Sequence, residues 1–203
     1  MGLLLQSMAI EMPLVERHPN RAGFRGVLTF VDAPSDKPPS GAKGHRVVLT
    51  KDAADAALPS LLGMALDYTP SLDRHNARMK IGVITSAEVV KSSRTEKPQA
   101  SWANEARQER VKTPTVRGAK DRAPHRIEVS GYLFARDFPE VISEMRAAGR
   151  NTLGMSYEIA DARIEDMKAP VWMITSCTFT GAALLRRDKA AYRNTSIELV
   201  EVR

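Results

Sequence analysis

The alternation of apolar and polar positions predicts a chain made mostly of short strands. Residues 127–133 alternate apolar side chains with polar or aromatic ones, which is the period of a half-buried strand. Other segments are rich in β-branched residues and end at Gly, Pro, Asn, Asp or Ser, as strands do. The expected strands are 26–31, 46–49, 80–90, 127–133, 153–160, 171–179 and 196–202.

Two segments have helical features. From Asp137 the apolar residues recur at i, i+3, i+4 and i+7, which predicts one apolar stripe on a helix that ends near Gly149. Thr50 can cap an Ala/Leu-rich helical segment that runs to Ala65 and is interrupted at Pro59. Two or three helices among six or seven strands, not strictly alternating, favour an α+β fold or a closed sheet with helices outside.

Composition is that of one ordinary domain. The chain has 203 residues, 43% hydrophobic and 27% charged, and no apolar run approaches the ~20 residues of a membrane helix. The single cysteine, Cys177, excludes an internal disulfide framework and a multi-cysteine zinc site. The N-terminus lacks the positive start of a secretory signal, so the cytoplasm is the expected compartment.

The positive charge is concentrated in one segment. Residues 91–126 hold ten Lys or Arg against four Asp or Glu, a net charge of +6 that equals the net charge of the whole chain. Because residues 91–124 have neither helical nor strand periodicity, we expect a flexible basic insertion in a domain spanning 23–203, after an N-terminal arm of residues 1–22. Contact with an acidic partner, a scaffold or packaged nucleic acid is the alternative interpretation.

Two residues are the principal candidates for chemistry. His75 ends a turn directly before a strand, where a rigid sheet would position it. Ser156 enters a strand after a short glycine-containing turn, and a nucleophilic serine needs a neutral imidazole nearby together with donors for the oxyanion. Cys177 is the rival nucleophile, but a cysteine in the middle of an apolar strand is usually buried and inert.

A metal site is not expected from the spacing of the histidines. His18, His45, His75 and His125 are scattered, and no two of them are four residues apart. His45 and His125 each adjoin an arginine at the start of a predicted strand, so both are expected to be solvated.

Three stretches resemble the prohead (capsid maturation) proteases of tailed phages, which are related in fold to the herpesvirus assemblins. The first is Leu72-Asp73-Arg74-His75-Asn76 followed by Lys80-Ile81-Gly82-Val83, which is similar to the family's histidine turn and Ile-Gly strand. The second is the strand around Gly131, the helix that follows it and the stretch 149–157, which resemble the family's "V-x-G-x-L … helix … Gly-(Leu/Met)-Ser" run. The third is 172–179, similar to the late strand "Glu-Val-Ser-Leu-Val-Thr". The order of these motifs, across about residues 24–190, is more specific than any one of them.

The resemblance implies roles for individual residues. His75 would be the general base and Ser156 the nucleophile of an acyl-transfer protease. The family's third catalytic residue would fall near Met173, and a methionine cannot orient an imidazole. Glu158, Thr175 or Ser176 could take that role, or the third catalytic residue could be missing. Arg186 or Arg187 would correspond to the arginine that supports the oxyanion through water in assemblins.

The resemblance also implies a fold, a function and partners. The fold would be α+β, an assemblin-like closed or partly closed, mainly antiparallel β-barrel with surrounding helices. The protein would be a serine endopeptidase, without a cofactor or metal, that cuts scaffold segments from the capsid protein, and itself, inside the immature capsid in the host cytoplasm. Self-association is expected, a membrane is not, and nucleic acid is the least supported partner. The alternative is an inactive assemblin-like structural or scaffolding protein of the capsid.

Overall fold

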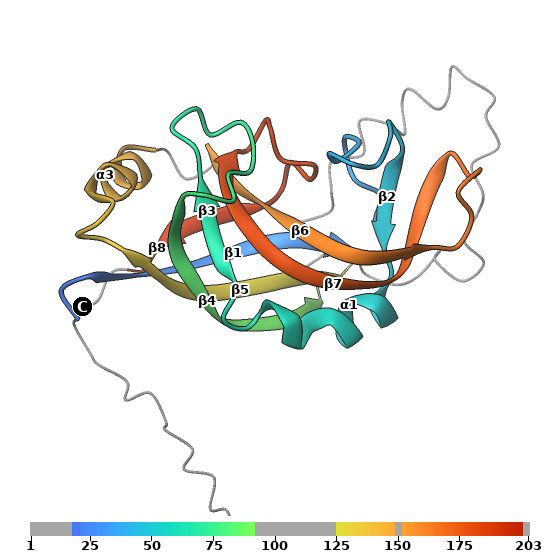
Figure 1. The fold of residues 1–203 in the computed structure, drawn as a ribbon, viewed down its shortest axis with the longest axis horizontal. Coiled ribbons are helices and arrows are strands. Elements are labelled where there is room, and N and C mark those ends of the chain that lie inside the picture. Colours follow the sequence, from blue (N-terminus) through green and yellow to red (C-terminus); the bar gives the residue numbers. More distant parts are fainter. Residues whose placement is uncertain (1–17, 92–124, 149–151, 201–203) are drawn as a thin grey trace, which may run out of the picture.

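A strongly twisted sheet of eight strands organises the protein in the computed structural model, which describes residues 18–91, 125–148 and 152–200 (Figure 1). The strand order is β2-β7-β3-β4-β5-β1-β8, and β6 pairs with β7 outside this path. The strands are β1 (Arg21–Val31), β2 (Arg46–Leu49), β3 (Ala65–Tyr68), β4 (Lys80–Lys91), β5 (His125–Phe134), β6 (Leu153–Ile164), β7 (Val171–Arg186) and β8 (Ser196–Leu199).

The predicted mainly-β α+β class is confirmed, but the sheet does not close into a barrel. Its ladders are antiparallel except for two, in which β2 and β3 each run parallel to β7. β2 and β8 lie at the two ends of the strand order and are not paired with each other in the described residues. The sheet is therefore mixed and open.

The helix predicted from Thr50 to Ala65 is right only in its first half. Thr50 caps α1 (Lys51–Ala57), because its Oγ1 accepts a hydrogen bond from the Ala53 N–H at 3.3 Å. At Pro59, which has no N–H to donate, the chain continues as the short 3₁₀ helix η1 (Leu58–Leu61). It then turns at Gly63, where φ is +79°, and enters β3, a strand that the sequence did not predict.

The second helix, α3 (Pro139–Ala147), begins two residues after the predicted start at Asp137. It buries the predicted apolar stripe, including Val141 and Ile142. The Tyr68 hydroxyl donates to Glu144 Oε2 at 2.9 Å and so joins α3 to β3. Burial and this carboxylate raise the pKa of Tyr68 to about 12. The predicted stop at Gly149 lies outside the described residues.

Several strand bounds differ from the prediction. β1 begins at residue 21, so the last two positions of the predicted N-terminal arm belong to the sheet, whereas residues 1–17 lie outside the described part of the chain. β6 and β7 extend four and seven residues further than predicted. The basic insertion after β4 also lies outside the described residues.

Two histidines expected to be solvated contact the protein instead. His125 begins β5 and is buried, with 9% of its surface exposed. The His45 ring is stacked on the Trp172 ring, with their centroids 4.5 Å apart. No helix within the described ranges is long and apolar enough to cross a membrane.

β7 is the strand on which the site is built. One of its edges pairs with β6 along most of its length. Its other edge pairs with β2 at the start, from Val171 to Ile174, and with β3 near the end, from Ala182 to Leu184. The last part of β7 therefore lies between β6 and β3, and α1 packs against the same strand.

Candidate functional site

The site is organised by a row of three residues across three strands. Asp67 on β3 and Ser156 on β6 are both register partners of Ala183 on β7, from opposite sides. Register partners point to the same face of a sheet, and neighbouring strands are about 4.8 Å apart, so the Cα atoms of Asp67 and Ser156 are roughly 10 Å apart on one face. Ala182, the preceding residue, belongs to the apolar core on the opposite face.

Small residues on β7 leave room above this row. Glu158 lies two residues after Ser156, on the same face of β6, and its register partner is Gly181. A Cβ at Gly181 would lie only 3.2 Å from Glu158 Oε2. With Ala183 next on this face of β7, the strand presents a shallow floor between the side chains of β3 and β6.

The loop between β3 and β4 brings His75 over this floor. Its Leu72 is buried and has a left-handed φ of +52°, and its carbonyl accepts a hydrogen bond from the Arg186 N–H at 2.8 Å. Thr69 Oγ1 donates to the Arg74 carbonyl at 3.2 Å, directly before the histidine. These contacts hold the loop against the end of β7.

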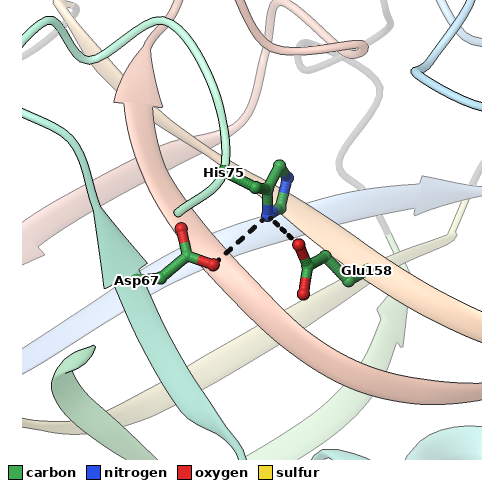
Figure 2. A group of neighbouring side chains, drawn as sticks. All are labelled: Asp67, His75 and Glu158. Carbon is green, nitrogen blue, oxygen red and sulfur yellow. Dashed lines mark ion pairs between the residues drawn. The ribbon is translucent and has the colours of Figure 1, made fainter. Parts of the chain in front are cut away.

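The His75 imidazole lies above β7, between Asp67 and Glu158 (Figure 2). Its Nδ1 is 3.1 Å from Glu158 Oε1 and 3.5 Å from Asp67 Oδ2. The other ring nitrogen, Nε2, points away from both carboxylates (Figure 2). The two carboxylates therefore act on one edge of the imidazole and leave its other nitrogen free of them.

Asp67 is the most strongly constrained member of the group. Its side chain is fully buried, and its Oδ1 accepts a hydrogen bond from the Asn76 N–H at 3.1 Å. Its Oδ2 has no hydrogen-bond partner among the described residues, although Lys80 Nζ lies 3.7 Å from it. Because a buried polar group needs compensation, the backbone donor and Lys80 offset part of the cost of burying this side chain.

His75, Ser156 and Glu158 line one cleft with a volume of about 700 Å³. This volume lies within the range of known ligand-binding pockets. Residues 37–42 form part of the wall of the cleft, and apolar side chains from the hairpin of β6 and β7 form another. These apolar residues include Ile159, Ile164, Trp172 and Ile174. A carboxylate, an imidazole and a hydroxyl that line one cleft are the groups that nucleophilic acyl transfer requires.

The late-strand candidates for the third group lie away from His75. Thr175 and Ser176 are exposed, and Thr175 Oγ1 donates to the Arg163 carbonyl at 3.3 Å. Met173 pairs with Val48 on β2, in the first part of β7, and does not line the cleft. Glu158 is the one predicted substitute that contacts the imidazole.

The predicted oxyanion arginines have other partners. Arg186 is exposed and makes two bonds of 3.0 Å to the Asp188 carboxylate. Arg187 Nε donates to the Thr195 carbonyl at 3.0 Å, and burial lowers its pKa. Neither arginine lines the cleft.

Gly154 and Cys177 also have structural explanations. Gly154 lies inside β6, and a Cβ there would lie 2.6 Å from Thr195 Oγ1, so the glycine is required for packing. Burial raises the pKa of the Cys177 thiol to about 11, which leaves it protonated near neutral pH. Cys177 does not line the cleft.

Sequence reasoning missed Asp67, although a signal was present. Asp67 is a charged residue within the otherwise apolar run Ala65-Leu66-Asp67-Tyr68. A charged residue is rarely buried in a strand unless it has a partner, so its presence there indicates a functional role. The helical segment predicted to run to Ala65 overlaps the start of β3, and this overlap hides the strand.

Comparisons with known proteins give no relative: no family model, no curated protein and no solved structure matches the chain.

Proposed function

We propose that this protein is a serine endopeptidase of the phage prohead type, with Ser156 as nucleophile, His75 as general base and Asp67 as the carboxylate that orients the base. The observation that carries the proposal is that His75 and Ser156 line one cleft, while Asp67 shares a register row with Ser156 and its Oδ2 lies 3.5 Å from His75 Nδ1. The order of sequence motifs that resembles the prohead proteases supports it independently.

The proposed reaction assigns the two nitrogens of His75 to different tasks. Nε2 removes the proton from Ser156 Oγ as the hydroxyl attacks the scissile carbonyl, and later returns the proton to the leaving amine. Nδ1 keeps its proton and faces the carboxylates, 3.1 Å from Glu158 and 3.5 Å from Asp67. A negative charge on that edge stabilises the imidazolium that forms during the attack.

Asp67 is the better orienting group, even though Glu158 Oε1 is nearer to Nδ1. The Glu158 side chain is 34% exposed, so water screens its charge. Asp67 is fully buried and is held by a backbone N–H, so its field is less screened and its direction is constant. Preorganised charge of this kind contributes most to catalysis.

The proposed substrate is the scaffold segment of the capsid protein, with self-cleavage as a second reaction. The apolar wall of the cleft suits an extended peptide that carries aliphatic side chains. Confinement of enzyme and substrate inside an immature capsid would raise their effective concentration, so a slow protease would suffice. We expect the basic insertion of residues 91–124 to interact with an acidic scaffold, and we expect self-association.

The competing proposal is an inactive structural or scaffolding protein of the capsid with the same fold. Its main support is Met173, where the resemblance would place a catalytic carboxylate or histidine. Asp67 weakens this objection, because it brings a carboxylate to His75 from another strand.

One experiment separates the two proposals. The capsid protein is co-expressed with the wild type, with Ser156→Ala or with the control Ser176→Ala, which removes an exposed serine from the same hairpin. We expect shortened capsid protein with the wild type and the control, and none with Ser156→Ala. Cleavage that persists with Ser156→Ala would assign the nucleophile elsewhere, and no cleavage by any of the three would support the structural protein.

A further inference from the structure

The proposed protease mechanism needs one carboxylate beside His75, but the structure has two. Asp67 Oδ2, His75 Nδ1 and Glu158 Oε1 all lie within 4.8 Å of one another. Within the part of the chain that the structure describes, neither Asp67 Oδ2 nor His75 Nδ1 has a hydrogen-bond partner, and the Asp67 carboxylate is fully buried. An unsatisfied buried carboxylate oxygen that faces a histidine nitrogen and a second acid requires an explanation beyond the triad.

The separations of the two carboxylate oxygens from His75 Nδ1 match those of a zinc ligand set. Zinc binds histidine nitrogen and carboxylate oxygen at about 2.0–2.2 Å, and a tetrahedral site of that radius places its ligand atoms roughly 3.3 Å apart. The observed separations from His75 Nδ1 are 3.1 Å to Glu158 and 3.5 Å to Asp67. Three protein ligands would leave the fourth position for water.

The surroundings of the cluster also suit a cation. The hydrogen bond from the Asn76 N–H to Asp67 Oδ1 fixes that carboxylate and leaves Oδ2 directed at the cluster, as supporting contacts do around metal ligands. Two carboxylates lie on one edge of the imidazole, and Lys80 is the ammonium group that the structure places near them, 3.7 Å from Asp67 Oδ2. Lys80 is 37% exposed, so its ammonium group can move into water when a cation enters.

We propose that Asp67, His75 and Glu158 bind one zinc-class divalent cation, and that this ion reversibly inhibits the protease. When Nδ1 binds the cation through its lone pair, the ring proton is on Nε2, so Nε2 has no lone pair with which to accept the Ser156 proton and His75 cannot serve as the base in the proposed mechanism. The binding of the ion stands on the geometry alone, whereas its inhibitory role rests on the proposed function. A switch of this kind would keep the enzyme inactive until zinc is withdrawn.

The binding test uses the full-length Ser156→Ala variant, so that self-cleavage cannot interfere. Zn²⁺ is titrated in competition with a chromophoric chelator, and Co²⁺ is added separately to record its visible absorption. We expect one equivalent of Zn²⁺, a rise in melting temperature on binding and an intense tetrahedral Co²⁺ spectrum. No stoichiometric binding would overturn the proposal.

Three further substitutions in that background locate the ion. Glu158→Gln should weaken Zn²⁺ binding by at least about 100-fold, since loss of a ligand costs more than the roughly 10- to 100-fold loss of a supporting contact. Lys80→Gln should strengthen it about 2- to 5-fold, because a competing charge is removed. His45→Gln, the control, should leave it unchanged. Unchanged binding in Glu158→Gln, with the melting temperature of the zinc-free protein preserved, would overturn the proposal.

The regulatory part is tested separately on the active protein. Zn²⁺ should inhibit the wild type with an inhibition constant equal to its dissociation constant, whereas Glu158→Gln, compared with its own zinc-free rate, should need at least about 100-fold more Zn²⁺ for half inhibition. Inhibition of both to the same extent would reject regulation through this site. If the wild type cleaves nothing, the proposed protease fails, but the binding result still decides whether the cation site exists.

Discussion

The two halves of the hairpin formed by β6 and β7 differ in regularity and in the strand that borders them. Near its open end, residues 153–158 pair with residues 181–186 without a break, and β3 lies on the other edge of β7. Towards its turn, the register shifts three times, Asp161 has a left-handed φ of +53°, and β2 is the neighbour. The regular half carries the polar cluster, and the irregular half supplies apolar side chains to the cleft.

This difference shows that a polar residue on a strand gains a chemical role from its neighbours. Ser156 and Ser176 lie on the same hairpin, but of the two only Ser156 shares a register row with the buried carboxylate of Asp67 and a cleft with His75. A fixed strand register holds such groups in place, whereas shifts of register change which face a side chain occupies. Chemistry is therefore expected in the regular half and substrate contacts in the irregular half.

The largest expected effect comes from Asp67→Asn. If this buried carboxylate orients His75, replacing it with a neutral amide should lower kcat for cleavage of a scaffold peptide about 10³- to 10⁴-fold, with little change in KM. Glu158→Gln, on the more exposed acid, should lower kcat no more than about 10-fold. Steady-state kinetics on both variants measure the difference, and the reverse ranking would make Glu158 the orienting group.

The second prediction concerns the floor of the site. Ala183→Val adds two methyl groups beneath the imidazole, and a displacement of about 1 Å would lower kcat about 100-fold. Ala182→Val, on the opposite face of β7, crowds the apolar core instead and should lower the free energy of unfolding by about 1–3 kcal/mol. Kinetics and urea unfolding on the pair distinguish the two faces. A large kcat loss in Ala182→Val, with none in Ala183→Val, would contradict the assignment of faces.

Local patterns predicted the strands and the cap of α1 well, because these depend on alternation and on single side chains. The alternation in 127–133 predicts strand β5, and the hydroxyl of Thr50 predicts the start of α1. Both features depend on neighbouring residues in the sequence and not on distant contacts. β3 was missed because four residues carry too little periodicity, and because its identity depends on insertion between β4 and β7. The open sheet could not be predicted, since closure depends on pairing between the end strands.

The candidate site likewise divides into residues that local sequence can predict and residues that depend on strand pairing. His75 and Ser156 could be proposed from motifs, because each stands in a short stretch that resembles a family motif. In the structure His75 lies in the loop before β4, and Ser156 lies within β6. Asp67 could not be assigned to them, since its place beside His75 depends on the parallel register of β3 and β7. A late-strand acid was sought near Met173, in the half of β7 that pairs with β2 instead.

The third prediction addresses the apolar half of the cleft. Ile164 lies at the end of β6, is partly exposed and lines the cleft. Ile164→Ala removes contact surface for the substrate without touching His75, so KM should rise about 5-fold while kcat stays constant. Thr175→Ala, on an exposed neighbouring position outside the cleft lining, is the control and should change neither constant. A fall in kcat in Ile164→Ala would contradict the separation of binding from chemistry.

The smallest effect is expected at Cys177, which lies in the irregular half of the hairpin. Its burial raises the pKa of the thiol to about 11. At pH 7.5 roughly one molecule in 3,000 would then carry the thiolate, which is the reactive form. Iodoacetamide at that pH should leave peptide cleavage unchanged over an hour, and Cys177→Ser should cleave at the wild-type rate within about 2-fold. Rapid inactivation of the wild type by iodoacetamide, with Cys177→Ser protected, would mean that this half of the hairpin also contributes to the chemistry.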